Sequence, residues 1–287
     1  MEVVRLSAGY LETHGSASPR LDAELLAANA LHLRRLDVYL QFDRPLAEEQ
    51  LGAIRELVRR RGDGEPMAYI TGVREFYGRS LVVTPEVLIP RPETETLVSL
   101  ALERARAVSG EPGGAGVTIA DLGTGSGCIA VTLAAELPDA TVVATDVSAA
   151  ALVIAAANAH RHEVAARVEL FAGSWAEPLA DGSFDIIVAN PPYIPSAEVA
   201  GLSRDVAERE PMLALDGGTD GLDCYRALLP SAAHVLAPQG WMGLEIDIRA
   251  AAAVTALGRE ALGAATAARV SNDLSGRPRV VTFEPQR

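Results

Sequence analysis

The chain has 287 residues, enough for one large domain or two ordinary ones. Hydrophobic residues make up 49% and charged residues 22%, as in globular proteins, so a largely disordered chain is excluded. No apolar run approaches the roughly 18 residues of a membrane span, and no secretory signal is visible. Two cysteines are too few for a disulfide framework. We expect a cytoplasmic protein with no membrane partner.

The charges narrow the possible functions further. All 25 basic residues are arginine, so chemistry that needs a lysine, such as Schiff-base formation, is excluded. Residues 1–80 hold 11 arginines and 12 acids, whereas the remainder holds 14 arginines and 26 acids. An acidic body argues against a partner bound through its phosphate backbone. The only basic cluster, 59–61, is typical of a solvated helix end, and we expect no direct contact with nucleic acid.

The first part of the chain has a helical pattern of apolar residues. One helix is expected to begin at Ser18-Pro19 and another to cover 46–60, ended by Gly62 and Gly64. This region contains no glycine-rich loop, metal-ligand spacing or nucleophile–base pair. We therefore predict a small N-terminal helical bundle over residues 1–75 that serves for binding or as a scaffold.

Residues 76–90 are predicted to form a β-hairpin linker, because aromatic and β-branched residues surround a turn at Gly78. Pro90 and Pro92 keep the following stretch extended, and Pro92 suits the first position of a helix that continues over 97–107. A linker rich in proline and glycine is expected over 111–116.

Strand and helix signals alternate in the rest of the chain, 91–287. Such alternation predicts an α/β domain with a mainly parallel sheet and a ligand at the carboxyl ends of the strands. Seven strands are expected, at 117–120, 141–145, 168–171, 184–189, 241–246, 267–270 and 279–283.

A glycine-rich loop follows the first of these strands and opens a helix. Glycine lets backbone N–H groups approach a ligand closely at a helix N-terminus. The G-x-G-x-G spacing is one residue tighter than the dinucleotide fingerprint, which favours a nucleoside ligand without a pyrophosphate. The alternative is a tight turn without a ligand. The candidate residues are Gly123, Thr124, Gly125, Ser126 and Gly127.

Asp146 ends the next predicted strand, 19 residues after Gly127. A carboxylate at this position can accept hydrogen bonds from both hydroxyls of a ribose. Its alternative role is that of a helix N-cap. In register with the glycine loop, the ribose role is favoured.

The buried strand at 184–189 ends in Asn190-Pro191-Pro192-Tyr193. Two prolines fix the backbone and remove two N–H donors, while Asn190 adds a carbonyl oxygen as an acceptor. Tyr193 adds a flat apolar face. Two acceptors and a stacking surface suit an –NH2 group on a planar carbon, whereas the alternative is a proline-rich surface turn.

Together these residues resemble a class I S-adenosylmethionine-dependent methyltransferase that acts on an amide or amino nitrogen. The chain is similar over nearly its whole length to the release factor glutamine N5-methyltransferases, and a Pro-Arg-Pro-Glu-Thr-Glu segment is the most specific match. The matching segments are 20–26, 69–72, 76–78, 87–95, 173–175, 190–193, 210–211 and 215–222.

The resemblance implies a Rossmann-like methyltransferase domain with a seven-stranded sheet, S-adenosylmethionine as cofactor and no metal. It implies methylation of the glutamine in the Gly-Gly-Gln motif of class I peptide chain release factors. Because residues 1–75 carry no chemistry but offer a near-neutral helical surface beside an acidic domain, we predict that they recognise this substrate beyond its glutamine loop. Cofactor contacts fall on residues 123–127, Asp146, Trp175 and Asn190. The glutamine-binding residues are Asn190, Pro191, Pro192 and Tyr193, of which Asn190, Pro191 and Tyr193 are expected to act in catalysis.

Leu81 and Asp247 depart from the pattern of that family. The alternatives are a methyltransferase for a ribosomal protein glutamine, which shares Asn-Pro-Pro-Tyr, and a DNA adenine N6-methyltransferase. A catalytically silent binding protein is a third. The acidic body argues against DNA, and the intact glycine loop and Asn190 argue against a silent protein.

Overall fold

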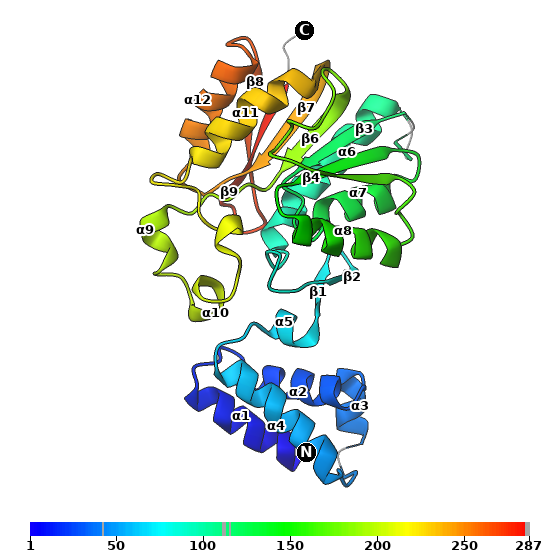
Figure 1. Ribbon diagram of the computed structural model, residues 1–287, viewed down its shortest axis with the longest axis vertical. Coiled ribbons are helices and arrows are strands. Elements are labelled where there is room, and N and C mark those ends of the chain that lie inside the picture. Colours follow the sequence, from blue (N-terminus) through cyan, green and yellow to red (C-terminus); the bar gives the residue numbers. More distant parts are fainter. Residues whose placement is uncertain (42, 111–112, 115, 285–287) are drawn as a thin grey trace. The chain divides into compact units, whose positions relative to one another are not determined.

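The computed structural model describes residues 1–41, 43–110, 113–114 and 116–284 (Figure 1). The chain forms two compact units. The smaller unit comprises Met1–Val73 and Ser203–Arg209, and the larger unit comprises Arg74–Leu202 and Glu210–Arg287. The linker expected over 111–116 lies partly outside the described residues. Within the described residues, no helix is both long and apolar enough to span a membrane.

The smaller unit is the predicted helical bundle. Pro19 begins the second helix, as its fixed φ angle favours. Leu11, Leu26 and Ile54 are fully buried between three of the helices. The helices of this part of the chain are α1 (Glu2–Thr13), α2 (Pro19–Ala30), α3 (Arg35–Leu40), α4 (Glu48–Gly62) and α5 (Met67–Thr71).

A short segment from much later in the chain completes this unit. Ser203–Arg209 contains the short helix α10 (Arg204–Ala207). Arg209 donates to the carbonyl of Asp63 at 3.0 Å, and Arg61 lies 3.8 Å from the carboxylate of Asp205. No local pattern in the sequence assigns this segment to the bundle.

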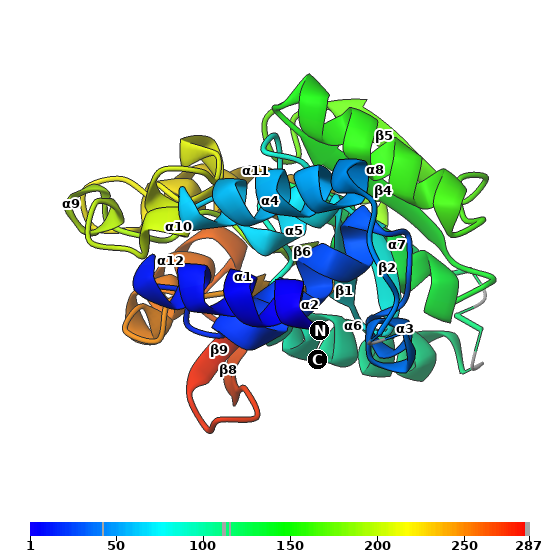
Figure 2. The ribbon, with the colours of Figure 1, turned by 90° about the horizontal axis from the view of Figure 1, so that it is seen from below.

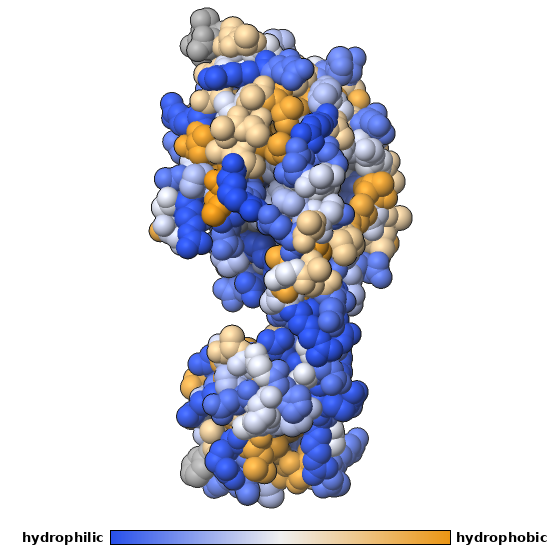
Figure 3. All heavy atoms as spheres, turned by 90° about the vertical axis from the view of Figure 1, so that its left-hand side faces the viewer, coloured by the Kyte–Doolittle hydropathy of each residue, from blue (hydrophilic) through white to orange (hydrophobic). Residues whose placement is uncertain are grey.

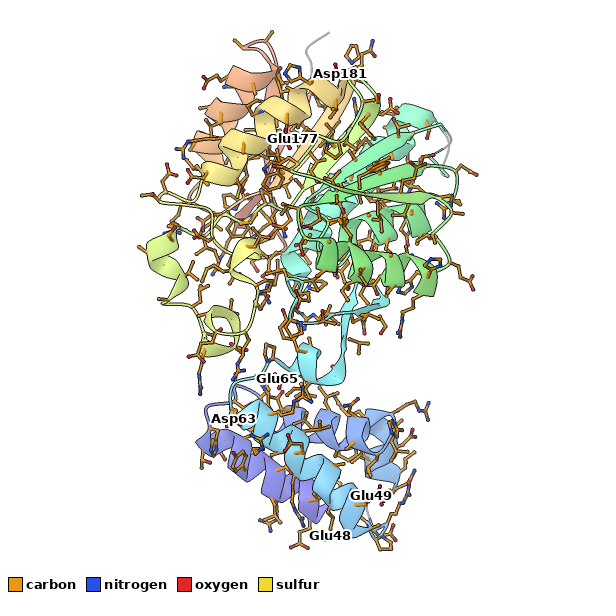
Figure 4. All side chains as sticks on the ribbon, in the orientation of Figure 1. Glu48, Glu49, Asp63, Glu65, Glu177 and Asp181 are labelled. Atoms are coloured by element: carbon orange, nitrogen blue, oxygen red, sulfur yellow. The ribbon has the colours of Figure 1, made fainter. Side chains whose placement is uncertain are left out.

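The three arginines at the end of α4 are all neutralised by carboxylates of the same unit. Arg59 pairs with Asp63 at 2.8 Å, Arg60 pairs with Glu65, and Arg61 pairs with Asp22 at 2.8 Å. Figure 4 shows Asp63 and Glu65 at this end of α4, with Glu48 and Glu49 at its beginning. The basic cluster is therefore an ion-paired helix end and not a free cationic patch.

The larger unit is built on a seven-stranded mixed sheet with the order β5-β4-β3-β6-β7-β9-β8. The first five strands of this order pair in parallel, and β9 is antiparallel to both of its neighbours. The predicted fold class is confirmed. The strands are β3 (Thr118–Leu122), β4 (Thr141–Asp146), β5 (Val168–Ala172), β6 (Phe184–Ala189), β7 (Leu236–Glu245), β8 (Ala267–Asn272) and β9 (Pro278–Glu284).

Helices cover both faces of this sheet (Figure 1 and Figure 2). Alternate residues of each central strand point to opposite faces: Ile186 and Val188 pack with α6, α7 and α8, whereas Ile187 and Ala189 pack with α11 and α12. Trp241 lies in the core. The helices are α6 (Glu95–Ser109), α7 (Cys128–Glu136), α8 (Ala149–Arg161), α11 (Asp223–Val235) and α12 (Ala251–Leu262).

Two boundaries differ from the sequence prediction. The strand predicted over 241–246 begins earlier, at Leu236, because β7 pairs with β6 from that residue across a register shift. The hairpin also begins earlier: β1 is Val73–Phe76 and β2 is Arg79–Val82. Its turn residues Tyr77 and Gly78 both have positive φ angles, 50° and 71°, as a two-residue hairpin turn requires.

Candidate active site

A cavity of about 790 Å³ lies in the larger unit at the carboxyl ends of β3, β4 and β6. Its volume is in the range of small-molecule sites. The cavity brings together most of the residues predicted for the site. Among the predicted residues, those that line it are Gly123, Thr124, Gly125, Ser126, Asp146, Trp175, Asn190 and Pro192.

The glycine loop turns through three left-handed residues. Gly123, Gly125 and Gly127 have φ angles of 78°, 56° and 79°, which only glycine adopts without strain. A Cβ atom on Gly127 would lie 3.1 Å from the backbone of Ala155 in α8. Gly127 therefore allows the loop to pack closely against α8, and it does not line the cavity.

Asp121, the penultimate residue of β3, holds this loop through hydrogen bonds. Its Oδ2 accepts hydrogen bonds from the Thr124 hydroxyl at 2.7 Å and from the N–H of Ala130 at 3.1 Å. The side chain is fully buried, and burial raises its pKa to about 7. The hydrogen bonds join the end of β3 to the first turn of α7.

Asp146 faces the cavity from the end of β4. Its Oδ2 accepts from the N–H of Gly125 and its Oδ1 from the N–H of Ser148, both at 2.8 Å. Ser148, not Asp146, is the N-cap of α8, so the structure removes the alternative role of Asp146 as a cap. Each carboxylate oxygen retains a lone pair for a further donor.

Trp175 lies against the glycine loop. A Cβ atom on Gly123 would come within 3.2 Å of the Trp175 ring. The backbone of Trp175 has a positive φ angle of 49°, uncommon for an aromatic residue, and its carbonyl accepts from the hydroxyl of Thr145 at 2.7 Å. The indole therefore occupies a defined position on the wall of the cavity.

The Asn190–Tyr193 loop begins directly after β6. Asn190 and Pro192 line the cavity, whereas Pro191 is buried and neither it nor Tyr193 is part of the lining. The Asn190 side chain donates from Nδ2 to the hydroxyl of Thr94 at 3.2 Å. The Tyr193 hydroxyl donates to Oε1 of Glu245 at 3.4 Å.

Two glycines pack closely against this loop from the segment after η2 (Met212–Ala214). A Cβ atom on Gly217 would lie 2.8 Å from Cα of Tyr193 and 2.9 Å from the carbonyl oxygen of Pro192. A Cβ atom on Gly221 would lie 2.4 Å from the carbonyl oxygen of Tyr193. Hydrogen bonds from Ile194 to Leu215 and from Gly217 to Ile194 fix the two segments side by side.

Several residues that support the site carry no local signal in the sequence. Asn158, fully buried in α8, donates to the carbonyls of Val82 and Ser126 and so ties the hairpin to the glycine loop. Glu210 is buried and accepts hydrogen bonds from the Arg91 guanidinium at 2.7 Å and from the N–H of Ile89 at 3.1 Å. These contacts join segments more than 30 residues apart, which no local spacing reveals.

The two departures from the family pattern have structural roles outside the cavity. Leu81 is fully buried in the core formed with α6 and α7. Asp247 pairs with Arg249 at 2.9 Å, and Arg249 also pairs with Glu198 at 2.9 Å. Neither residue is part of the cavity lining.

Comparisons with known proteins agree with this geometry. Residues 2–72 match the PrmC N-terminal domain, and residues 109–209 match the methyltransferase small domain. A release factor glutamine methyltransferase of Geobacter sulfurreducens is 49% identical over 247 residues, covering 86% of this chain and 84% of that protein. One of Moorella thermoacetica is 46% identical over 277 residues, covering 96% and 93%.

Solved structures show the same fold at lower identity. A methyltransferase from Pyrococcus furiosus superimposes with a TM-score of 0.53 at 18% identity, covering 74% of this chain and 91% of that one. The fold and the matching domains define a methyltransferase. With curated relatives at 46–49% identity over most of both chains, this chain belongs to the release factor glutamine methyltransferase family.

The contact of Gly217 with the Asn190–Tyr193 loop generates a first prediction. Gly217→Ala places a methyl group against backbone atoms, which cannot rotate away as a side chain can. We expect the loop to move and the rate of methyl transfer to fall on the order of 10²-fold, the effect of a misplacement of about 1 Å. Cofactor affinity, measured by calorimetry, should remain within about threefold because the glycine loop is untouched.

Gly52→Ala is the matched control, since nothing lies within 4 Å of a Cβ atom there, in the middle of α4. It should leave methyl transfer unchanged. Normal transfer by Gly217→Ala would show that the close packing does not position the loop.

Proposed function

We propose that the protein transfers a methyl group from S-adenosylmethionine to the side-chain amide nitrogen, N5, of the glutamine in the Gly-Gly-Gln motif of class I peptide chain release factors. Such a modification would modulate translation termination, and a cytoplasmic location is part of this proposal. The observation that carries the proposal is that the glycine loop, Asp146 and Asn190 line the same cavity. The names of the relatives that match most of the chain support the same substrate.

The residues of the cavity fit an adenosyl cofactor. Gly123 and Gly125 line the cavity with left-handed backbones and no Cβ atoms, and Asp146 lines it with a carboxylate that can accept from ribose hydroxyls. The Trp175 ring provides an apolar wall. When bound, S-adenosylmethionine supplies a methyl group already activated by its sulfonium, so the protein has mainly to align the two reactants.

The Asn190–Tyr193 loop is suited to hold an amide. An amide nitrogen is a poor nucleophile because its lone pair is delocalised into the carbonyl. We propose that Asn190 Oδ1 and the Pro191 carbonyl accept its two N–H bonds, orient the nitrogen toward the methyl group and stabilise the positive charge that develops there. Pro192 and Tyr193 would provide the adjacent surface for the planar group.

A DNA adenine methyltransferase is disfavoured by the charges. The protein carries a formal net charge of −13, and the arginine cluster of α4 is already paired with Asp22, Asp63 and Glu65. DNA binding depends on cations that are free to neutralise phosphates. The ribosomal-protein alternative shares the same amide chemistry, and the names of the relatives favour release factors over it.

We propose that the smaller unit recognises the release factor beyond its glutamine loop. On α3, Leu36 and Leu40 are 62% and 69% exposed. They are four residues apart and therefore lie on one face of the helix. Figure 3 shows apolar residues among the polar ones on the displayed face of this unit. Exposed leucines of this kind are suited to packing against another protein.

Replacement of Asn190 is the central test. Asn190→Ala should lower the single-turnover rate of methyl transfer by on the order of 10²- to 10³-fold, the usual effect of removing a preorganised polar group from a reacting centre. Cofactor affinity should fall only slightly, because Asp146 and the glycine loop are intact. Purified release factor, ribosomal protein and DNA are offered in parallel with labelled methyl donor. Labelling of either of the latter two, and not of the release factor, would refute the proposed substrate.

Asp146 tests the cofactor site separately. Asp146→Ala should weaken binding of S-adenosylmethionine by about 2–3 kcal/mol, since hydrogen bonds to a charged group are lost. Calorimetry measures the change. Asp181→Ala is the control, because Asp181 is an exposed acid (Figure 4) outside the cavity lining and should leave the affinity unchanged. Equal affinities of the two variants would reject the ribose role.

The smaller unit is tested by the double variant Leu36→Ser, Leu40→Ser. It should raise the KM for intact release factor by about tenfold, which corresponds to roughly 1.4 kcal/mol of lost binding. The kcat and the KM for a short glutamine peptide should not change. Val153→Ser, at a residue that is 67% exposed on α8, is the control for loss of an exposed apolar side chain. An unaltered KM for intact release factor would argue against this role.

A further inference from the structure

Thr94 is a buried threonine at the junction of two helical segments. It is the last residue of the 3₁₀ helix η1 (Pro92–Thr94), directly before α6, and its φ and ψ angles of −64° and −20° are helical. Its side chain makes no capping hydrogen bond with α6. Thr94 is only 1% exposed, so its hydroxyl is buried but not used for the helix. This points to another role.

The hydroxyl of Thr94 instead contacts the Asn190 side chain. Asn190 Nδ2 donates to Thr94 Oγ1 at 3.2 Å, across 96 residues of sequence. Both residues line the cavity. Among the described residues, none donates a hydrogen bond to Asn190 Oδ1. The amide is thus held by its nitrogen, and its oxygen remains available as an acceptor.

A buried carboxyl lies at the other end of the Asn190–Tyr193 loop. Glu245, the last residue of β7, is fully buried, and its Oε1 accepts from the Tyr193 hydroxyl at 3.4 Å. At the start of the loop, the Thr94 hydroxyl acts as the acceptor, as a threonine hydroxyl can, and so satisfies the Asn190 nitrogen.

From this geometry we infer that Thr94 is a positioning residue for methyl transfer, because it fixes the Asn190 side chain with Oδ1 directed to the substrate amide. Thr94 supports the start of the Asn190–Tyr193 loop, and Glu245, which accepts from the Tyr193 hydroxyl at 3.4 Å, supports its end. The inference rests on the proposed function, since it assigns the freed oxygen to a substrate amide.

Three variants of the full-length protein test this role. Thr94→Val keeps the shape of the side chain and removes the hydroxyl, whereas Thr94→Ser keeps the hydroxyl. The control, Thr132→Val, removes the hydroxyl of a buried threonine of α7 that has no hydrogen-bond partner among the described residues. Each is assayed by single-turnover methyl transfer to release factor, by the KM for that substrate, and by calorimetric affinity for S-adenosylmethionine.

Thr94→Val should transfer the methyl group 10- to 100-fold more slowly, an effect of misplacing the acceptor. Its KM and its cofactor affinity should stay within about threefold of the parent. Thr94→Ser and Thr132→Val should stay within about threefold in rate. The inference is overturned if Thr94→Val transfers at the parental rate, if Thr94→Ser is as slow as Thr94→Val, or if the loss of rate follows a loss of cofactor affinity.

The orientation itself has a readout that does not need turnover. The side-chain amide protons of Asn190, assigned by NMR through their loss in Asn190→Ala, should exchange slowly in the parent and faster in Thr94→Val. Equal exchange in both proteins would overturn the inference. If the parent methylates no glutamine, the proposed function fails, and the NMR comparison still decides whether Thr94 fixes Asn190.

Discussion

The parallel pairing of β3 with both β4 and β6 is the constraint on which the site depends. Parallel strands end at the same edge of a sheet, so the residues that follow them must meet there. The glycine loop follows β3, Asp146 ends β4 and Asn190 follows β6. Three segments spread over about a quarter of the chain thereby line one cavity.

Strand pairing brings these segments together, but buried polar side chains fix their conformation. Asp121 holds the Thr124 hydroxyl and the first turn of α7. Asn158 joins the same loop to β2 through its side-chain amide. The Asn190–Tyr193 loop has a comparable support in Thr94 and Glu245. Loops alone are mobile, so a reaction that depends on alignment requires this kind of support.

The sequence predicts the parts of the protein that local patterns encode. Helical periodicity predicts the N-terminal bundle, strand–helix alternation predicts the sheet, and the glycine loop and the Asn190–Tyr193 segment both contribute residues to the cavity. The supports are invisible at that level because each joins distant segments: Thr94 and Asn190 are 96 residues apart, and Val82 and Asn158 are 76 apart. Asn158 also stands in an alanine-rich helix, where its side chain has no local partner to indicate a role. The contribution of Ser203–Arg209 to the smaller unit is hidden for the same reason.

The buried carboxyls Asp121 and Glu245 show what this support costs. Burial raises the pKa of each to about 7. An exposed carboxyl titrates near 4, so the folded protein binds these protons more tightly than the unfolded chain does. The free energy of unfolding therefore decreases as pH rises from about 4 to about 7.

Well-packed apolar residues at these two positions would avoid that loss of stability. Such residues could not accept from Thr124, Ala130 or Tyr193, and the loops on both sides of the cavity would lose the contacts that orient them. Polar groups that lower stability are expected where they shape a functional site.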